Sequence, residues 1–408
     1  MRCSGLQTRS NLKNDKLERK QAMSKVAFNK RLLSIESSAS IALMDKARSM
    51  KAQGIDVISL AGGEPDFNTP EPVESAAIQA MLAGRTHYTT GRGIPALREK
   101  IAEKLETENH ILCRDVLVTP GCKYAICVAL EALLNPGDEV LIPTPSWVSY
   151  DAMVRLAGGV PVSVPLSFDD EYRISEKLLE KYVSSRTRII IINTPNNPTG
   201  RVLSGEEASI LSAFARRHDL FVIADEVYEK IIFDGREHIS LGSYPELKGR
   251  VIVANGFSKF AAMTGWRVGY IAGPGEVIDM AYRIYQHTMT CISEFSQIAA
   301  LTALSHPEET ERMRRSYLER RDYWYGAMQG IPGVTLRKAE GAFYAWMRIE
   351  KDGMNSDETA AFLLQKAGVV MVPGNAYGEH ACSCVRASLA TAMPDLIEAA
   401  RRIRTALQ

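Results

Sequence analysis

Two basic residues that follow a predicted buried strand offer the clearest chemistry in the sequence. The strand covers residues 251–254, which are apolar and mostly β-branched, and the Asn-Gly pair at 255–256 ends it. Lys259 comes next, where partial burial would lower the pKa of its amine and let it attack a carbonyl carbon or hold an aldehyde cofactor as an imine. Arg267 offers a planar guanidinium suited to phosphate. Taken alone, the pair fits an ordinary surface loop equally well.

Polar residues also follow three other predicted strands. The carboxyl ends of the strands in an open parallel sheet lie along one edge, and ligands bind there. The three segments are Gly121, Cys122 and Lys123 after strand 116–118, residues 193–200 after strand 189–192, and Asp225 with Tyr228 after strand 221–224. A helix start with free N–H groups suits a phosphate, and the other two segments supply amides, an acid and a phenol. Each segment alone has an ordinary explanation as a turn or a helix start, but their shared position favours a binding site.

The elements that position these residues alternate between strand and helix. Apolar runs without polar alternation predict strands that are buried on both faces, which indicates a mostly parallel α/β sheet covered by helices. Residues 277–325 are predicted to be largely helical, and the segments from 334 to 407 mix strands with helices. We therefore predict a basic arm at 1–30, a small domain at 31–62 and 308–408, and a large domain at 63–307.

Composition excludes several classes of protein. The chain has 408 residues, 46% of them apolar and 24% charged, which is typical of a soluble globular protein with about two domains. Its formal net charge of +1 gives no reason to expect nucleic acid or an anionic membrane as a partner. No apolar run approaches the roughly 18 residues that a membrane span needs.

The cysteines and the N-terminus carry further expectations. Seven scattered cysteines indicate free thiols and a reducing compartment. The first thirty residues hold eight Lys or Arg and only two acids, which favours a disordered basic arm over a targeting segment, with Met23 as a candidate start. The cluster from His380 to Cys384 is interpreted as a loop, so no metal is predicted. A glycine pattern at 91–96 matches a dinucleotide fingerprint, but no buried strand precedes it, and a nicotinamide site is rejected.

Together the motifs resemble a known family. The segments SLAGGEPDF, HYTTGRGIPALRE, NTPNNPTG, ADEVYE, NGFSKFAAMTGWRVGY, GAFYAWM and VRASLAT follow the family's order from about residue 38 to the C-terminus. They are similar to fold-type I pyridoxal phosphate enzymes of the class I aminotransferases, in particular the bacterial and plant aspartate or prephenate branch. The resemblance implies an α/β large domain with a mostly parallel seven-stranded sheet and a smaller α+β domain.

The resemblance also implies roles for individual residues around pyridoxal 5'-phosphate. Lys259 would hold the cofactor and move protons, and Asp225 would keep the pyridine nitrogen protonated so that the ring withdraws electrons. The remaining contacts would come from Tyr228 and Asn197 on the ring oxygen, Trp147 on the ring face, and Arg267, Ser258, Lys123 and the backbone of Gly121 and Cys122 on the phosphate. Tyr88 would reach the phosphate of a neighbouring subunit, which implies a homodimer with shared active sites.

Substrate recognition follows from the same resemblance. Arg386 would grip the α-carboxylate of the substrate, helped by Gly63 and Asn197, while Lys123, Ser38 and Ser40 would engage a distal carboxylate. Three departures from the family pattern could reshape that pocket: Cys122 in place of a smaller residue, Ser146 in place of an aromatic one, and the run TMTCIS at 288–293.

The expected activity is transamination in a cytoplasmic homodimer. A two-half-reaction cycle would transfer an amino group from an amino acid, aspartate or glutamate, to a 2-oxo acid such as 2-oxoglutarate or oxaloacetate. Alternatives are prephenate, aromatic or alanine specificity, a β- or γ-lyase with the same cofactor, and a non-catalytic ligand-sensing domain. The last would need a folded DNA-binding segment before residue 38, for which the basic arm is too short and too polar.

Overall fold

The structure is a computed structural model that describes residues 29–33, 35 and 39–408. A four-residue helix, α2 (Lys30–Leu33), belongs to a first unit, Met1–Ser37. Every other element among the described residues lies in the second unit, Ser38–Gln408, to which the following description applies. Nearly all of the predicted basic arm, the candidate start at Met23, and Ser38 fall outside the described residues.

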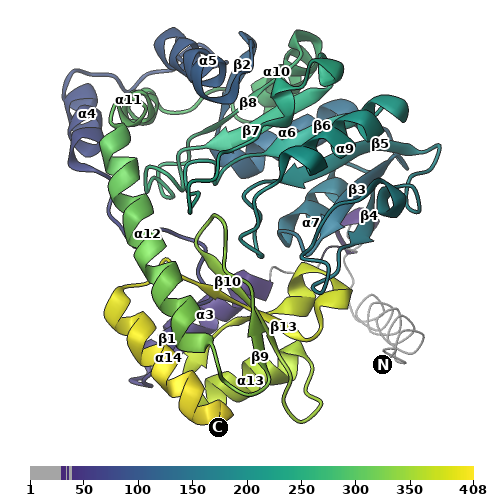
Figure 1. Ribbon diagram of the computed structural model, residues 1–408. Helices are drawn as coiled ribbons and strands as arrows, with labels where there is room; N and C mark the ends of the chain where they lie inside the picture. Colours follow the sequence, from purple (N-terminus) through teal and green to yellow (C-terminus); the bar gives the residue numbers. More distant parts are fainter. Residues whose placement is uncertain (1–28, 34, 36–38) are drawn as a thin grey trace. The chain divides into compact units, whose positions relative to one another are not determined.

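A seven-stranded sheet forms the centre of the second unit (Figure 1). Six strands run parallel, and β8 is antiparallel to both of its neighbours, β2 and β7. In spatial order the strands are β2 (Val116–Thr119), β8 (Gly269–Ala272), β7 (Val251–Gly256), β6 (Phe221–Asp225), β5 (Thr187–Asn193), β3 (Glu139–Thr144) and β4 (Val160–Pro165). The predicted mostly parallel, seven-stranded fold is confirmed.

Helices cover both faces of this sheet, because successive residues of each strand point to opposite sides. On one face, Ile189, Ile191 and Ile223 pack with α6 (Gly121–Leu133), α7 (Ser149–Leu156) and α10 (Gly275–Thr288). On the other face, Ile190 and Ile192 pack with α5 (Pro95–Asn109), α9 (Gly205–Arg217), α4 (Glu71–Leu82) and α11 (Glu294–Ala303). This double burial explains why the strands read as continuous apolar runs.

A smaller antiparallel sheet lies below the first in Figure 1. Its strands, in spatial order, are β12 (Val372–Pro373), β13 (Cys384–Ser388), β10 (Tyr344–Ile349) and β9 (Val334–Leu336), and β1 (Ile58–Ser59) pairs in parallel with β11 (Val369–Val370) beside it. A separate apolar core joins these strands to α12 (Pro307–Met328), α13 (Ser356–Ala367) and α14 (Met393–Leu407), and α3 (Ala39–Ala52) lies in the same region. The domain boundaries given above remain a prediction.

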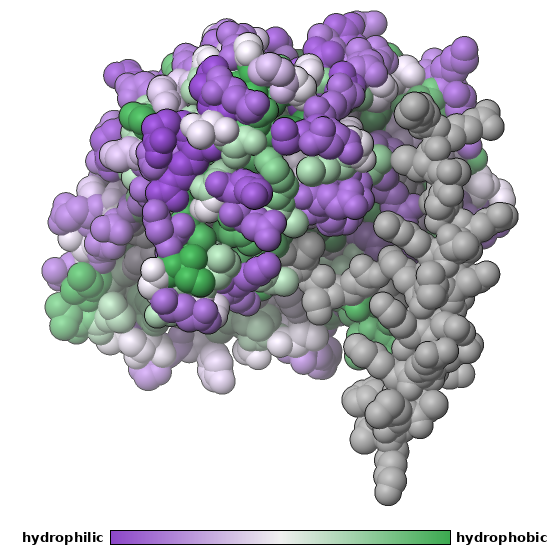
Figure 2. All heavy atoms as spheres, turned by 90° about the horizontal axis from the view of Figure 1, so that it is seen from below, coloured by the Kyte–Doolittle hydropathy of each residue, from purple (hydrophilic) through white to green (hydrophobic). Residues whose placement is uncertain are grey.

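The long helix α12 connects the two sheets. Figure 1 shows α12 running from the helices beside the large sheet down to the smaller sheet, and at its start Thr310 donates to the Phe260 carbonyl over 3.2 Å. Five short helical segments also occur among the described residues of this unit: α8 (Glu176–Leu179) and the 3-10 turns at Leu241–Ser243, Pro245–Leu247, Gly374–Tyr377 and Glu379–Ala381. Seen from below, the surface is mostly hydrophilic with small apolar patches (Figure 2). None of the helices among the described residues is long and apolar enough to cross a membrane.

Candidate active site

Several of the predicted site residues lie where four strands of the large sheet end, β2, β5, β6 and β7. Strand pairing aligns Asn193 at the end of β5 with Asp225 at the end of β6, and Asp225 with Ala254 of β7. The side chain of Asn193 donates to the Asp225 carbonyl over 3.0 Å and accepts from the Asn197 N–H over 2.8 Å. The loop after β5 is therefore fixed against the end of β6.

Lys259 lies in the turn that follows β7, and its side chain is partly buried. Its Nζ donates to the carbonyl oxygen of Gly63 and lies 6.0 Å from the centre of the Tyr228 ring. Burial lowers the pKa of Lys259 to about 8, because an ammonium loses hydration there. About a tenth of this amine is therefore neutral at pH 7, far more than in an ordinary lysine with a pKa of about 10.4.

Asp225 is almost fully buried, with 3% of its surface exposed. Its Oδ2 accepts from the Tyr150 phenol over 2.5 Å, and its Oδ1 accepts from the Val227 N–H over 3.2 Å and from the Cys122 thiol over 3.5 Å. Burial raises the pKa of Asp225, while these three donors oppose that rise by stabilising the carboxylate. The acid therefore has the hydrogen bonds that an ionised group needs in a buried place.

The start of α6 forms an open cradle of backbone N–H groups. No side chain of residues 29–33, 35 or 39–408 caps this helix, and Gly121 adopts φ +80° at its first position. A Cβ at Gly121 would come within 2.6 Å of Nη2 of Arg267, so only glycine lets the guanidinium lie against this backbone. Arg267 itself is exposed and donates to the carbonyls of Thr264 and Pro120 over 2.9 and 3.3 Å. Ser258 is buried next to Lys259.

Arg386 belongs to β13 of the smaller sheet and reaches the same region, with 3% of its surface exposed. It donates from Nη1 to Oδ1 of Asn197 over 3.0 Å and from Nη2 to the Ala61 carbonyl over 2.7 Å. Its guanidinium stacks over Tyr344, 4.3 Å from the ring centre. Its Nε is buried and has no hydrogen-bond partner among the described residues, which is costly unless a ligand accepts from it.

The remaining predicted residues differ from one another in their contacts and in their exposure. The phenol of Tyr228 is hydrogen-bonded to the Tyr344 phenol over 2.7 Å. Lys123 is exposed, and its Nζ lies 4.9 Å from the centre of the Trp147 ring. Tyr88 lies in the loop between α4 and α5 with 86% of its surface exposed. Ser38 and the side chain of Ser40 lie outside the described residues.

Two site residues were missed by sequence reasoning. Tyr150, at the start of α7, reads as a core residue of an amphipathic helix, although its place just after β3 is a signal of the same kind as the others. Tyr344 lies on β10, and only the pairing of β10 with β13 brings it beside Arg386. Its hydroxyl lies 2.9 Å from the position of a Cβ at Gly63, so a larger residue there would clash.

A buried polar cluster behind Asp225 was also missed. Glu226 and Glu229 follow β6, and Lys104 of α5 pairs with Glu229. Oε1 of Glu229 accepts from Asn255 over 2.7 Å, and Oε2 of Glu226 lies 3.1 Å from Nε2 of His238. Glu226, Glu229 and His238 lie close enough to hold a metal ion, but the Lys104 ammonium already supplies a positive charge to this place.

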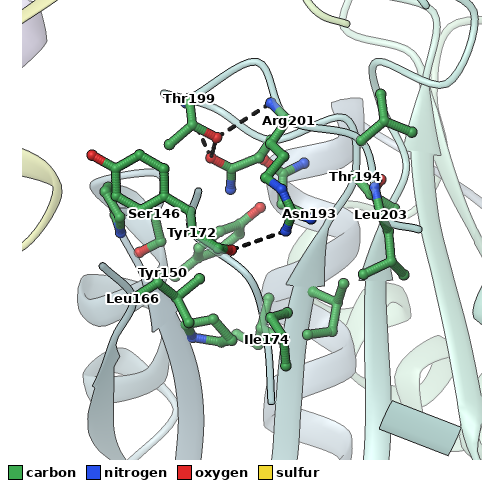
Figure 3. A pocket seen from close by; sticks show the side chains of 16 residues that line it. Ser146, Tyr150, Leu166, Tyr172, Ile174, Asn193, Thr194, Thr199, Arg201 and Leu203 are labelled. Atoms are coloured by element: carbon green, nitrogen blue, oxygen red, sulfur yellow. Dashed lines mark hydrogen bonds between the residues drawn. The ribbon is translucent and has the colours of Figure 1, made fainter. Parts of the chain in front are cut away.

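A small cavity lies beside the end of β5, where Asn193 is among its lining residues (Figure 3). Tyr150, Tyr172 and Asn193 are among the residues that line it, and its volume is about 50 Å³. Ordered water would fit, but a cofactor with an amino acid would need several hundred cubic ångströms. This cavity is therefore not the substrate site.

These features fit a phosphorylated aldehyde cofactor that binds a carboxylate substrate. The open helix start with Arg267 suits a phosphate, and the amine of Lys259, with its lowered pKa, suits an aldehyde. The Nε of Arg386, unpaired among the described residues, suits a carboxylate. Fold-type I pyridoxal phosphate enzymes have a mostly parallel seven-stranded sheet, with a lysine after one strand and an acid at the end of the neighbouring strand, as Lys259 and Asp225 are here.

Comparison with known proteins agrees with this class. Residues 55–403 match the family model of aminotransferase class I and II. The chain is 40% identical to the aspartate aminotransferase of Musicola paradisiaca over 382 residues, 92% of this chain and 96% of the relative. It is 42% identical to an aromatic-amino-acid aminotransferase of Thermococcus litoralis over 364 residues, 88% of this chain and 93% of the relative.

Comparison with solved structures supports the same family. The aspartate aminotransferase of Thermus thermophilus, solved with maleate, is similar with a TM-score of 0.89 and 36% sequence identity, covering 94% of this chain and all of that one. The chain therefore belongs to the class I and II aminotransferases, whose members work with pyridoxal phosphate.

Proposed function

We propose that this aminotransferase moves the amino group of aspartate or glutamate to a 2-oxo acid such as 2-oxoglutarate or oxaloacetate, in two half-reactions. The observation that carries the proposal is the buried guanidinium of Arg386 beside the Lys259 site, whose Nε finds no partner in the part of the chain that the structure describes. A carboxylate would accept from it and be held in a fixed orientation. Alignment of a bound substrate in this way supplies a large part of catalysis.

Different residues of the chain would attach the cofactor, transfer the proton and hold the ring. Pyridoxal phosphate, when bound, supplies an aldehyde that takes up the amino group and a ring that withdraws electrons. Lys259, with its pKa of about 8, would attach the cofactor and then carry a proton from the substrate's α-carbon. Asp225 would hold the proton of the ring nitrogen, while Tyr228 and Asn197 would donate to the ring oxygen.

The remaining contacts would fix the phosphate and the ring. The free N–H groups of Gly121 and Cys122 at the uncapped start of α6, with Arg267 beside them, support a phosphate site at this place. Ser258, buried next to Lys259, would add a hydroxyl, and Lys123 a further positive charge. Trp147 would stack on the ring face.

Selectivity for acidic substrates rests on Lys123. Its ammonium stands against the Trp147 ring at 4.9 Å, where it could meet a second carboxylate. The Thermus thermophilus enzyme was solved with maleate, a four-carbon dicarboxylate, which supports the same choice. Aromatic amino acids are the second candidate, because the Thermococcus litoralis relative carries that name.

A panel of amino donors against several 2-oxo acids tests this proposal. We expect the highest kcat/KM for aspartate and glutamate, and parallel lines in double-reciprocal plots, as two separate half-reactions require. Release of ammonia without any 2-oxo acid would favour the lyase alternative. No bleaching of the cofactor's absorption by any amino acid would contradict amino transfer itself.

We further propose a homodimer with shared active sites in the cytoplasm. Tyr88 exposes 86% of its surface, and Ile78, Met81 and Leu82 of α4 are exposed apolar residues close to it in sequence, which suits a contact between subunits. The partner subunit's Tyr88 would complete the phosphate site. Mixing inactive Lys259→Ala chains with inactive Tyr88→Ala chains should restore partial activity, because one of the two shared sites is then intact; no recovery in a mixed dimer would contradict shared sites.

The cytoplasmic location rests on free thiols at Cys113, Cys122, Cys127, Cys291 and Cys384, which suit a reducing compartment. Cell fractionation checks this part of the proposal. Recovery of the protein outside the cytosolic fraction would contradict it.

A further inference from the structure

The thiol of Cys122 lies against the acid that the proposed chemistry depends on. Cys122 is the second residue of α6, and its Sγ is 3.5 Å from Oδ1 of Asp225. Both side chains are buried, with 8% and 3% of their surfaces exposed. The contact therefore joins the phosphate cradle of α6 to the end of β6.

The charge states of the two groups fix the direction of this hydrogen bond. Burial raises the pKa of the Cys122 thiol well above its ordinary value, and the neighbouring Asp225 charge adds to the rise. The sulfur therefore keeps its proton and donates it, while the carboxylate accepts. Thiols are weak donors, but a hydrogen bond to an ionised acceptor is stronger than one between neutral groups.

Asp225 has few other means of carrying a buried charge. In the described part of the chain no lysine, arginine or histidine forms an ion pair with it, so its donors are Tyr150, the Val227 N–H and Cys122. A carboxylate has about four acceptor positions. These donors take three, which leaves one position for a protonated ring nitrogen.

We propose that Cys122 is a positioning residue, whose thiol holds Asp225 ionised and oriented toward the ring nitrogen of the cofactor. The role rests on the assignment of the cofactor to this site and goes beyond the backbone contact predicted for Cys122 from the sequence. Without the thiol, Oδ1 of Asp225 keeps one donor, and the carboxylate holds the ring proton less firmly.

Two substitutions at one position separate this role from simple packing. Cys122→Ala removes the donor, and Cys122→Ser replaces it with a stronger one of similar size. Cys127→Ala is the matched control, because Cys127 is a free thiol on the same helix with no hydrogen bond to Asp225. Cofactor affinity, the pH midpoint of the bound cofactor's absorption band, and the thermal midpoint are measured for all four proteins.

The alanine variant should bind pyridoxal phosphate about tenfold more weakly, as expected for the loss of one hydrogen bond to a charged group. The pH midpoint of its absorption band should rise by roughly half a pH unit or more. A pyridine ring that is held less firmly in its protonated form withdraws less electron density from the bond between the cofactor and Lys259. The serine variant should return both values close to those of the wild type. The Cys127→Ala protein should match the wild type in both.

Two results would overturn the proposal: unchanged affinity and midpoint in Cys122→Ala, or equal losses in the alanine and serine variants, which would show that only the sulfur's bulk matters. Both readouts are binding measurements without substrate. A wild-type protein that binds the cofactor but turns over no amino acid would therefore contradict the proposed function alone.

Discussion

Nη1 of Arg386 donates to Oδ1 of Asn197 over 3.0 Å, and this bond joins a strand of the smaller sheet to the loop after β5 of the larger one. Nη2 is held by the Ala61 carbonyl, so the guanidinium is oriented before any substrate arrives. Nε is left to bind a ligand. Orientation in advance reduces the entropy lost on binding.

Replacing Arg386 by lysine tests the guanidinium itself. Arg386→Lys keeps the positive charge but loses the planar fork that binds a carboxylate through two N–H groups. We expect kcat/KM for aspartate to fall about a hundredfold or more, mainly through a higher KM, while the cofactor's absorption is retained. Steady-state kinetics with the cofactor saturating makes the measurement, and an unchanged KM would be inconsistent with a carboxylate at Arg386.

The pH dependence of cofactor attachment follows from Lys259. Its pKa is lowered to about 8, so the neutral amine that attacks an aldehyde increases as pH rises from 7 to 9 and changes little above that. The rate at which the cofactor-free chain takes up pyridoxal phosphate should follow this curve, with its midpoint near pH 8. A midpoint near 10, the range of an ordinary lysine, would show that the amine is not desolvated.

Asp225→Asn tests the charge behind the ring nitrogen. The amide has the same shape but no negative charge, so it cannot hold a proton on the ring. We expect kcat to fall by about a hundredfold or more, the range seen when a preorganised electrostatic contact is removed. The thermal midpoint of the cofactor-free protein should change little or rise, since an uncharged group is cheaper to bury. Activity within threefold of wild type would remove Asp225 from the mechanism.

The buried pair of Lys104 and Glu229 predicts a large effect on stability. Lys104→Met should lower the free energy of unfolding by about 3–5 kcal/mol, because Glu229 would be left as an unpaired buried charge. The double variant Lys104→Met with Glu229→Gln should recover most of the loss. Lys100→Met, which breaks an exposed pair with Glu103 on the same helix, should cost less than about 0.5 kcal/mol.

The pair of Lys104 and Glu229 also predicts how stability depends on pH. Burial alone would raise the pKa of Glu229, but the charges of Lys104 and His238 outweigh it and bring the pKa to about 2. A lowered acid pKa stabilises the fold above the ordinary value near 4.5 and loses that contribution as pH falls toward 2. Denaturant titrations at several pH values measure both effects, and equal losses in the Lys104 and Lys100 variants would contradict the buried charge.

Local patterns were enough to predict the residues at the strand ends. The run from Ile189 to Ile192 has no polar alternation, which indicates burial on both faces, and the polar residues that follow must then lie at one edge of the sheet. The same logic placed Asp225 and Lys259. Their positions depend on the strand to which each is attached, so a short stretch of sequence contains the information.

Contacts set by strand pairing could not be predicted in the same way. Tyr150 follows β3 and Asp225 ends β6, and β5 lies between those two strands in the sheet. Residues 369–372 form one apolar run, yet Val370 pairs with β1 and Val372 pairs with β13. No local period shows that the run is shared between two sheets, because that choice depends on distant partners.

Lys259 is proposed to carry the cofactor opposite an ionised Asp225, and borohydride trapping of the cofactor tests this attachment. The protein is loaded with pyridoxal phosphate, reduced with borohydride, digested and analysed by mass spectrometry, with Lys259→Ala as the control. We expect the reduced cofactor on the peptide that contains Lys259, and no covalent cofactor in the variant, which should still bind it reversibly but not turn over. Cofactor fixed to a different lysine, or equal labelling of the Lys259→Ala protein, would contradict the account.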